Sequence, residues 1–402
     1  MNKILLFSLF LFSSSLMAQT WDRKTNIPSA RHHPITFSIN GIGYSVTGTS
    51  SANVPTKDFY DYDPASNSWS TLPLFPGLSR SFGIGTVAPN NLAYIGFGTS
   101  STQFLRDLWS FDASDSSWTR LADCPGSARR HPAMISIGNR IYVGLGDSPT
   151  GNLNDWWMYD ISTNSWTQTA NLPANGRHHP FMFNASGSVY AGLGHGNIGN
   201  RGVIYKDWYK LDTASNTWTA MSDFPGEARV AGTQFTAYGY GFVLSGDGDD
   251  HSFMQTGEMW RYDPSTDIWT QLPSHPGNSI WAPGSFVINN EVYFLGGLNR
   301  RLNFFPKNVY KFMLLDPTGI EEEQEILANT FVYPNPANAE ISWKSDISVT
   351  DVRIYNSVGQ LFQTANAMVG EVDVNNIADG LYFVQFFNKN ELVKTSKVLI
   401  QH

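Results

Sequence analysis

Short apolar and aromatic runs follow one another along most of the chain, separated by small and polar turn-forming residues. Residues 131–169 hold four such runs, HPAMISI, IYVGLGD, DWWMYD and SWTQT, with GNR between the first two. Runs of this length, bounded by turn residues, are typical of β-strands. The pattern therefore predicts a unit of four short strands.

This unit of four strands repeats. Six tryptophans follow one another at intervals of 48 to 52 residues. Each of the last five has an aspartate six residues before it and a second acidic residue eleven residues before it. The tryptophans are Trp21, Trp69, Trp118, Trp166, Trp218 and Trp269, the aspartates Asp63, Asp112, Asp160, Asp212 and Asp263, and the other acids Asp58, Asp107, Asp155, Asp207 and Glu258. Constant short spacings with variable long ones indicate a fixed unit with loops of different length.

The second strand of each unit ends in glycine. The six positions are Gly48, Gly98, Gly146, Gly194, Gly246 and Gly297. A glycine there permits a positive φ or a close backbone approach. The turn before this strand is marked in some units by Asn40–Gly41, Asn90–Asn91 or Asn289–Asn290, which favour a tight hairpin.

Composition narrows the class of protein. Charged residues make up 15% and aromatic residues 14% of the chain, with 35 Gly and 21 Pro, which favours an all-β fold. The formal net charge of −8 argues against nucleic acid or an anionic membrane surface as the main partner. The single cysteine, Cys124, cannot form an intrachain disulfide and has no neighbouring histidine or aspartate at a spacing typical of a nucleophile.

The repeat resembles the kelch type of β-propeller. The similarity rests on the glycine-ended second strand, the aromatic residue before aspartate, the tryptophan six residues on, and the Pro and Arg that follow; it covers residues 20–315. The resemblance implies an all-β propeller whose blades each contain four antiparallel strands.

The two ends of the repeat predict six blades. The sixth unit begins near Ser279 and has a third strand at 308–314, but no tryptophan follows it. Trp21 instead belongs to a fourth strand with no unit in front of it. We expect this N-terminal strand to close the ring by pairing with Val309–Met313, which leaves no open sheet edge.

Residues 1–18 have the features of a secretory signal peptide. Lys3 gives a positive start, Ile4–Phe12 is apolar, and Ala18 ends a stretch of small residues, which predicts cleavage before Gln19. The apolar run is too short to span a bilayer, and we expect no transmembrane segment in the mature chain.

The composition changes after the propeller. Residues 316–328 include four Glu among positions 321–325 and are predicted to form an acidic linker. Alternating strands separated by turns then predict a small Ig-like β-sandwich over residues 329–402.

This C-terminal segment resembles the type A sorting domain of the bacterial type IX secretion system. The resemblance rests on Tyr-Pro-Asn-Pro at 333–336, Ile354–Tyr355 with Gly359–Gln360, and Gly-Leu-Tyr-Phe at 380–383. It implies export to the periplasm by the signal peptide and then transport across the outer membrane by the type IX machinery. We therefore expect a secreted or outer-membrane-surface protein.

The loops that open each blade carry the candidate site residues, because in a propeller they share one face with the loops after the second strand. Aligned on the following strand, the openings read Arg31-His32-His33, Arg80-Ser81-Phe82, Arg129-Arg130-His131, Arg177-His178-His179, Arg229-Val230-Ala231 and Ile280-Trp281-Ala282. The candidate ligand-binding residues are Arg31, His33, Arg80, Arg129, His131, Arg177, His178, His179, Arg229, Trp281, Asp147 and Asp247.

Two interpretations of these positions stay open. The arginine that recurs in five of six openings favours a framework role, in which it ties loops together through backbone carbonyls and a neighbouring acid. The positions that vary between blades favour a polar, partly cationic mouth for an anionic or hydroxyl-rich ligand, since Arg binds carboxylates with two hydrogen bonds. Trp281 would offer a stacking face beside a small apolar sector at Val230 and Ala231.

Metal binding is a further alternative. Adjacent histidines on a strand point to opposite faces, so a metal would need one histidine from each of several blades. The acidic loop SGDGDDHS at 245–252 lacks the complete pattern of a calcium loop. We assign no metal ligand and no cofactor from the sequence.

The sequence thus favours a secreted or cell-surface binding module for a glycan or protein ligand. The alternative is a sugar enzyme, because six-bladed kelch propellers include the bacterial sialic-acid mutarotases, whose working acid and Arg follow the glycine of the second strand. In GLGHGNIGNRG, His195 takes the place of the acid and Arg201 follows six residues later, which makes these two residues the catalytic candidates.

Overall fold

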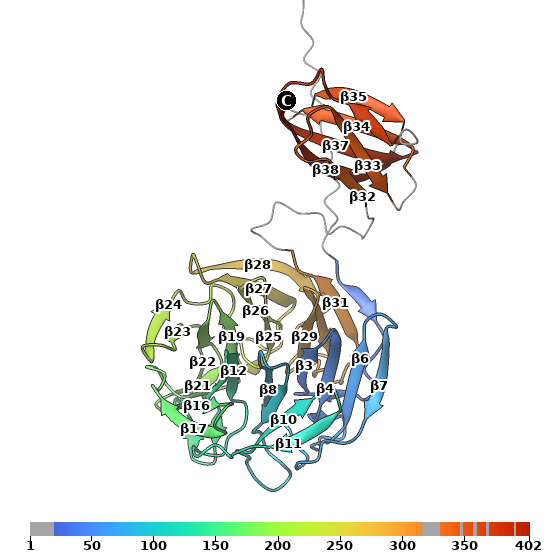
Figure 1. The fold of residues 1–402 in the computed structure, drawn as a ribbon. Coiled ribbons are helices and arrows are strands. Elements are labelled where there is room, and N and C mark those ends of the chain that lie inside the picture. Colours follow the sequence, from blue (N-terminus) through green and yellow to red (C-terminus); the bar gives the residue numbers. More distant parts are fainter. Residues whose placement is uncertain (1–19, 316–329, 346–348, 357–359, 367–369, 390) are drawn as a thin grey trace, which may run out of the picture. The chain divides into compact units, whose positions relative to one another are not determined.

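The computed structural model describes residues 20–315, 330–345, 349–356, 360–366, 370–389 and 391–402 (Figure 1). These residues form two compact units, divided between Leu315 and Asp316. The predicted signal peptide at 1–18 and the predicted linker at 316–328 lie outside the described residues.

The first unit is a ring of six four-stranded antiparallel sheets, as the repeat predicts. Blade 1 contains β3 (Ile35–Ile39), β4 (Ile42–Val46), β6 (Phe59–Asp63) and β7 (Ser68–Leu72), and blade 2 contains β8 (Ile84–Val87), β9 (Ala93–Gly96), β10 (Leu108–Asp112) and β11 (Ser117–Arg120). Blade 3 contains β12 (Ala133–Ile137), β13 (Arg140–Gly144), β16 (Trp156–Asp160) and β17 (Ser165–Thr169), and blade 4 contains β19 (Phe181–Ala185), β20 (Ser188–Gly192), β23 (Trp208–Asp212) and β24 (Thr217–Met221). Blade 5 contains β25 (Thr233–Ala237), β26 (Tyr240–Leu244), β27 (Gly257–Asp263) and β28 (Ile268–His275).

Blade 6 joins the two ends of the unit. It contains β29 (Gly284–Ile288), β30 (Glu291–Leu295), β31 (Val309–Met313) and the N-terminal strand β1 (Asp22–Lys24). β1 runs antiparallel to β31, with Asp22 opposite Lys311 and Lys24 opposite Val309. The pairing expected from Trp21 is therefore present, and it covers the edge of β31.

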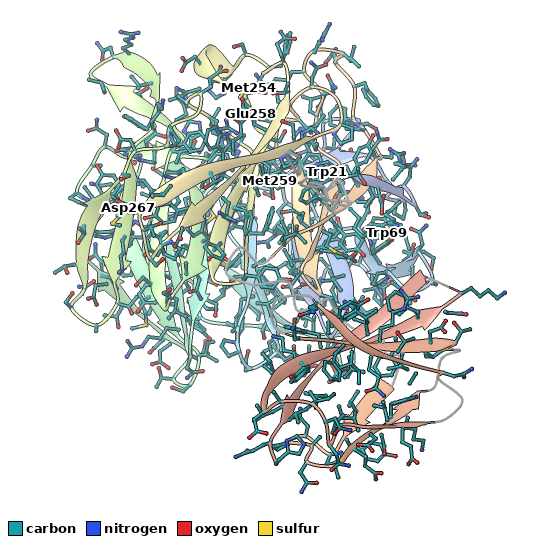
Figure 2. All side chains as sticks on the ribbon, turned by 90° about the horizontal axis from the view of Figure 1, so that it is seen from above. Trp21, Trp69, Met254, Glu258, Met259 and Asp267 are labelled. Carbon is teal, nitrogen blue, oxygen red and sulfur yellow. The ribbon has the colours of Figure 1, made fainter. Side chains whose placement is uncertain are left out.

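The repeated tryptophans connect neighbouring blades. Trp69 Nε1 donates to the carbonyl of Thr25 at 3.1 Å, and Trp166 donates to that of Ala122 at 2.8 Å. Trp21 makes the matching bond to the carbonyl of Pro273 in blade 5, at 3.3 Å (Figure 2 labels Trp21 and Trp69). Five of the six indoles, those of Trp21, Trp69, Trp166, Trp218 and Trp269, thus donate their N–H to a carbonyl of the preceding blade, which explains the constant spacing.

The six glycines at the ends of the second strands also connect adjacent blades. All six have positive φ, from 81° at Gly194 to 101° at Gly48. Each donates its backbone N–H to the carbonyl of the residue at the Arg position of the next blade, for example Gly146 to Arg177 at 2.7 Å and Gly297 to Arg31 at 2.8 Å. A Cβ on Gly146 would lie 2.7 Å from the Arg130 carbonyl oxygen, so both predicted reasons for glycine apply.

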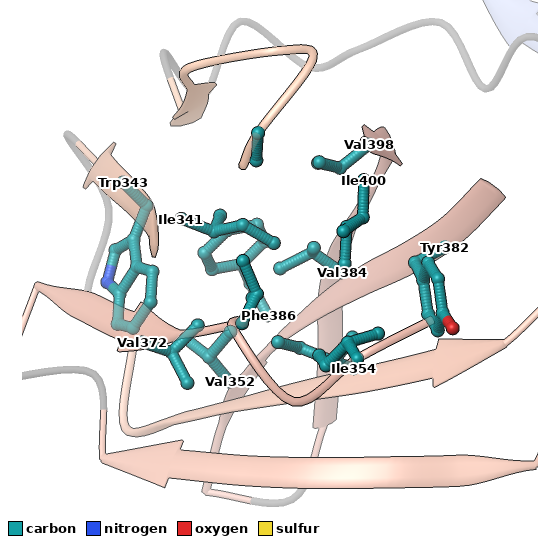
Figure 3. Close-up of a cluster of buried hydrophobic side chains, with 13 residues drawn as sticks. Ile341, Trp343, Val352, Ile354, Val372, Tyr382, Val384, Phe386, Val398 and Ile400 are labelled. Atoms are coloured by element: carbon teal, nitrogen blue, oxygen red, sulfur yellow. The ribbon is translucent and has the colours of Figure 1, made fainter. Parts of the chain in front are cut away.

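The second unit consists of two antiparallel sheets. One contains β32 (Thr330–Tyr333), β33 (Glu340–Ser345) and β36 (Glu371–Asp373), and the other contains β35 (Leu361–Asn366), β34 (Asp351–Asn356), β37 (Gly380–Asn388) and β38 (Glu391–Ile400). Ile341, Val352, Val384 and Phe386 are fully buried in its apolar core (Figure 3).

The helical content of the described residues is one short 3-10 turn, Asp249–His251. No helix among them is long and apolar enough to cross a membrane.

Candidate functional site

The blade openings and the loops after the second strands form one connected face of the ring. In every blade, the residue after the Arg position pairs through the backbone with the residue after the glycine. The pairs are His32 with Thr49, Ser81 with Thr99, Arg130 with Asp147, His178 with His195, Val230 with Asp247, and Trp281 with Leu298. These backbone pairs fix the side chains of both loops around the channel mouth.

The next residue of each opening has a left-handed backbone. The φ values are 51° at His33, 62° at Phe82, 52° at His131, 50° at His179, 53° at Ala231 and 50° at Ala282. All but Phe82 line a channel cavity of about 130 Å³, which also contacts Thr36, Gln234 and Ser285 of the innermost strands. The repeated conformation turns this position toward the channel cavity in five of the six blades.

The recurring arginines are framework residues. Arg31, Arg80, Arg129, Arg177 and Arg229 have no exposed side-chain surface. Each pairs with the acid of its own blade: Asp58, Asp107, Asp155, Asp207 and Glu258, respectively. Although these arginines are among the ligand-binding candidates, their guanidinium groups are enclosed and already bonded.

The pair in blade 3 illustrates the geometry. Arg129 Nη1 and Nη2 donate to the two carboxylate oxygens of Asp155 at 2.7 and 2.8 Å, and Nη1 also lies 3.1 Å from the Leu145 carbonyl. Burial acts to raise the pKa of Asp155, but the hydrogen bond and charge of Arg129 outweigh it, and the pKa is lowered. The acid eleven residues before each repeated Trp is therefore the partner of the framework arginine.

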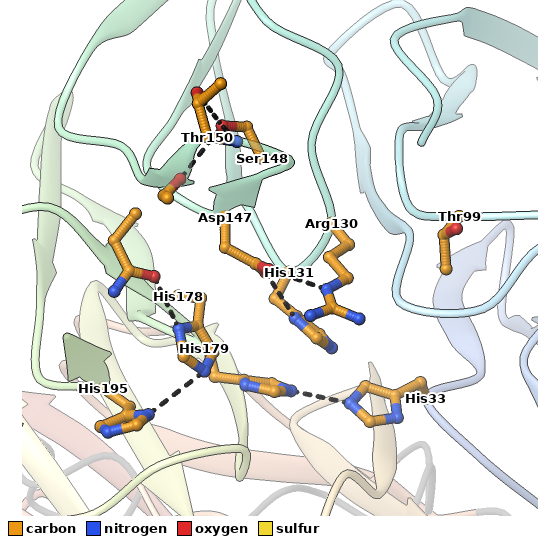
Figure 4. Close-up of polar contacts among 12 residues, drawn as sticks. His33, Thr99, Arg130, His131, Asp147, Ser148, Thr150, His178, His179 and His195 are labelled. Carbon is orange, nitrogen blue, oxygen red and sulfur yellow. Dashed lines mark hydrogen bonds and ion pairs between the residues drawn. The ribbon is translucent and has the colours of Figure 1, made fainter. Parts of the chain in front are cut away.

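Three histidines from three blades meet in the channel. His33 Nε2 lies 2.9 Å from His179 Nε2, although blades 1 and 4 stand opposite one another in a ring of six (Figure 4). The rings of His131 and His179 stack with centroids 3.5 Å apart. Burial, followed by the charge of neighbouring groups, lowers the pKa of all three well below the ordinary value, so the rings are neutral at pH 7.

A second series of histidines continues from this group toward blade 5. His178 Nδ1 lies 2.8 Å from Asn152 Oδ1, and its Nε2 lies 3.4 Å from His195 Nδ1. His195 Nδ1 in turn lies 3.1 Å from His251 Nε2. Seven of the nine histidines of the chain, all but His275 and His402, thus gather at the channel mouth.

The predicted catalytic pair is not assembled. His195 and Arg201 belong to the hairpin of β21 (His195–Ile198) and β22 (Arg201–Ile204), where His195 pairs with Ile204 at the base and Arg201 pairs with Ile198 at the tip. The base and the tip of this hairpin are three residues apart along each strand, which separates His195 from Arg201 by about 10 Å. His195 therefore joins the histidine series, whereas Arg201 is exposed beyond it.

Two other arginines lie at the mouth and keep donors unused. Arg130 Nε donates to Asp147 Oδ2 at 2.8 Å, while its side chain is 39% exposed. Arg300 Nε lies 3.0 Å from Asp247 Oδ2, its Nη1 donates to the His251 carbonyl at 2.9 Å, and its side chain is 33% exposed. Neither Nη group of Arg130, nor Nη2 of Arg300, bonds to any residue that the structure describes.

Two of the predicted residues support these arginines. Asp147 joins Arg130 to His131, whose Nδ1 lies 3.2 Å from Asp147 Oδ1. Asp247 is buried beneath Arg300; burial raises its pKa to about 6, and the charge of Arg300 acts against the rise. Both carboxylates hold side chains of the mouth in place, and that of Asp247 is enclosed.

Trp281 lies within the same group. Its ring centroid is 4.6 Å from that of His33 and 4.9 Å from that of His32, and the Arg300 guanidinium lies 4.7 Å from it. Val230, Ala231 and Ala282 pack beside it as a small apolar cluster. The apolar sector predicted in blade 5 is present, but its side chains are buried against each other.

Sequence reasoning missed Arg300 and His251 as members of this site. Both lie in loops after a glycine-ended second strand, Arg300 three residues after Gly297 and His251 five residues after Gly246. The repeat indicates the loop but not the residue within it, because these loops differ in length between blades.

The ring of six four-stranded sheets, with conserved geometry at each blade opening, defines the first unit as a kelch-type β-propeller. Comparison with protein families matches residues 43–303 to the Attractin/LZTR1 beta-propeller family and residues 331–401 to the secretion system C-terminal sorting domain. The chain therefore belongs to the Attractin/LZTR1 beta-propeller family and carries a type IX sorting domain. It is an exported protein, secreted or held at the outer-membrane surface.

The similarity of this chain to individual proteins is weaker than its match to the family. The chain is 32% identical over 99 residues to the N-acetylneuraminate epimerases of Escherichia coli (strain K12) and Shigella flexneri. The match covers 24% of this chain and spans about a quarter, 27%, of those relatives. A solved structure titled "Structure of YjhT" superposes with a TM-score of 0.57 at 15% identity, over 64% of this chain and 89% of that one, which supports the fold alone.

Proposed function

We propose that the exported propeller binds a carboxylated sugar at its channel mouth. The observation that carries the proposal is the pair of partly exposed arginines, Arg130 and Arg300, with unused Nη donors next to the histidine group. A guanidinium whose Nε edge is held by an aspartate presents its remaining donors in a fixed direction, which suits a carboxylate.

The side chains between the two arginines suit the rest of a sugar. Neutral imidazoles carry one donor and one acceptor nitrogen each and can bond to hydroxyl groups. Outside the central three, burial also lowers the pKa of His32, His178 and His195. The names of the curated relatives make N-acetylneuraminate, a sugar with one carboxylate, the first ligand to test.

Titration calorimetry with N-acetylneuraminate tests this site. We expect Arg130→Met and Arg300→Met each to weaken binding about tenfold or more, because a charge-assisted hydrogen bond contributes about 1.5–3 kcal/mol. Arg120→Met is the matched control, since Arg120 is 58% exposed on β11, the outermost strand of blade 2, and pairs with Asp123. Equal affinity in all three variants would place the ligand elsewhere on the chain.

A second candidate is the interconversion of anomers or epimers of such a sugar at the same mouth. The partial match to N-acetylneuraminate epimerases favours it, as does the contact between His195 and His251, whose rings could take up and return a proton. Proton NMR of freshly dissolved N-acetylneuraminate would reveal a faster approach to anomeric equilibrium. This activity should fall in His195→Ala and stay unchanged in His402→Ala; binding without any rate change would leave the first proposal alone.

A further inference from the structure

The central histidines have the composition and spacing of a metal site. His33, His131 and His179 each offer one ring nitrogen, and the three ligand atoms lie within 4.8 Å of one another. Metal–nitrogen bonds of about 2.0–2.1 Å separate two ligating nitrogens by about 3–4 Å. The 2.9 Å approach of His33 to His179 is already in this range, so a small change in side-chain torsions of the third ring completes the set.

The hydrogen bonding of the group leaves two nitrogens, His131 Nε2 and His179 Nδ1, without a partner among the described residues. His131 Nε2 is buried, the His131 side chain is 7% exposed, and this nitrogen bonds to no residue that the structure describes. A buried polar atom without a partner costs about 1–3 kcal/mol. A cation that accepts its lone pair would remove that cost.

Neighbouring side chains orient two of the three rings. Asp147 Oδ1 accepts from His131 Nδ1 at 3.2 Å (Figure 4). His32 Nδ1 lies 2.7 Å from His33 Nδ1. A carboxylate on the far nitrogen of a metal-binding histidine fixes its tautomer and raises its basicity. The Asp147 carboxylate thus gives His131 the hydrogen bond that metal-binding histidines usually make through their other ring nitrogen.

We propose that His33, His131 and His179 bind one Zn²⁺ in the propeller channel. Three protein nitrogens leave a fourth position, which faces the channel cavity of about 130 Å³ and has room for water or a small anion. Three of the six positions with this left-handed backbone provide the ligands, and the other three hold Phe82, Ala231 and Ala282, so the site is specific to this arrangement of blades.

The proposal is tested on the untagged mature protein with the metal alone, so its outcome does not depend on sugar binding. We expect one Zn²⁺ per chain by calorimetry, and visible absorption bands of four- or five-coordinate Co²⁺ after substitution. His131→Ala and His179→Ala should each weaken Zn²⁺ binding at least about 100-fold, because loss of a direct ligand exceeds the 10–100-fold effect of an outer partner. His402→Ala in the C-terminal unit is the control and should bind like the wild type.

Circular dichroism of each variant separates loss of metal from loss of fold. Because a channel variant that fails to fold gives no information, wild-type crystals soaked in Zn²⁺ provide the second measurement. An anomalous peak bonded to the three histidines is the expected result. A wild type that binds no Zn²⁺ at micromolar concentration, or a peak at other residues such as His195 and His251, would overturn the proposal.

Discussion

Two kinds of arginine lie on the channel face, and burial distinguishes their roles. The five framework arginines are enclosed and each bonds to an acid of its own blade. Arg130 and Arg300 are also held by aspartates but remain partly exposed. A buried charge is costly to leave unpaired, whereas an exposed one keeps its hydration and can exchange it for a ligand.

Arg129→Met should therefore destabilise the propeller by about 3 kcal/mol or more, because it leaves the Asp155 carboxylate without its principal partner. Arg120→Met, which removes an exposed arginine from the same region of the chain, should cost less than about 1 kcal/mol. Urea unfolding followed by tryptophan fluorescence measures both. Similar values for the two variants would contradict the framework role.

A buried histidine outside the mouth links stability to pH. His275 bonds to Ser245 Oγ at 2.9 Å and stacks on Phe294, and burial lowers its pKa to about 4. Below the ordinary pKa of 6.5 the unfolded chain binds the proton first, so stability from this residue is present above pH 6.5 and is lost as the pH falls toward 4.

The loss amounts to about 3 kcal/mol for a pKa difference of this size. His275→Gln removes the ionisable group, so the difference in unfolding free energy between wild type and variant should shrink by that amount between pH 7 and pH 4. A difference that stays constant over this range would show that His275 is protonated in the folded protein.

At the scale of the element, the blade opening and the glycine of the second strand act as one junction. Gly146 combines a φ of 91° with a hydrogen bond to the next blade and a neighbouring carbonyl 2.7 Å from the position of a Cβ. Gly138, in the hairpin between β12 and β13, has a φ of 54° and no atom within 4 Å of that position.

Gly146→Ala should consequently destabilise the propeller by about 2 kcal/mol or more, and Gly138→Ala by about 1 kcal/mol or less. Both substitutions place an alanine at a positive φ. The difference between their losses of stability therefore measures the effect of the close contact at the blade junction. Thermal unfolding of the two variants beside the wild type measures it. Equal melting temperatures would show that the junction tolerates a Cβ.

The strands could be predicted from the sequence because residues with the same structural role recur at the same spacing from blade to blade. The hydrogen bond of the glycine recurs in all six blades, and the strand after Trp21 completes blade 6 as the fourth strand completes each other blade. The site could not be predicted as well, since it depends on side chains that meet across the ring. Nothing in the local pattern indicates that His33 and His179, 146 residues apart, lie in contact.

In the whole molecule, the two units have different roles. The sorting domain at 331–401 directs export, and the propeller presents one polar face built from six blade openings. The fold itself hosts many functions, so the ligand must be argued from the mouth residues.

The function that we propose for this mouth is recognition of the carboxylate of a sugar. The most direct test is a calorimetric titration of the wild-type propeller with N-acetylneuraminate and, in parallel, with its methyl ester, which keeps the ring and removes the charge. Binding of the acid, with the ester about tenfold weaker or more, is the result expected from Arg130 and Arg300. Equal affinity for the two compounds, or no binding of either, would contradict the claim.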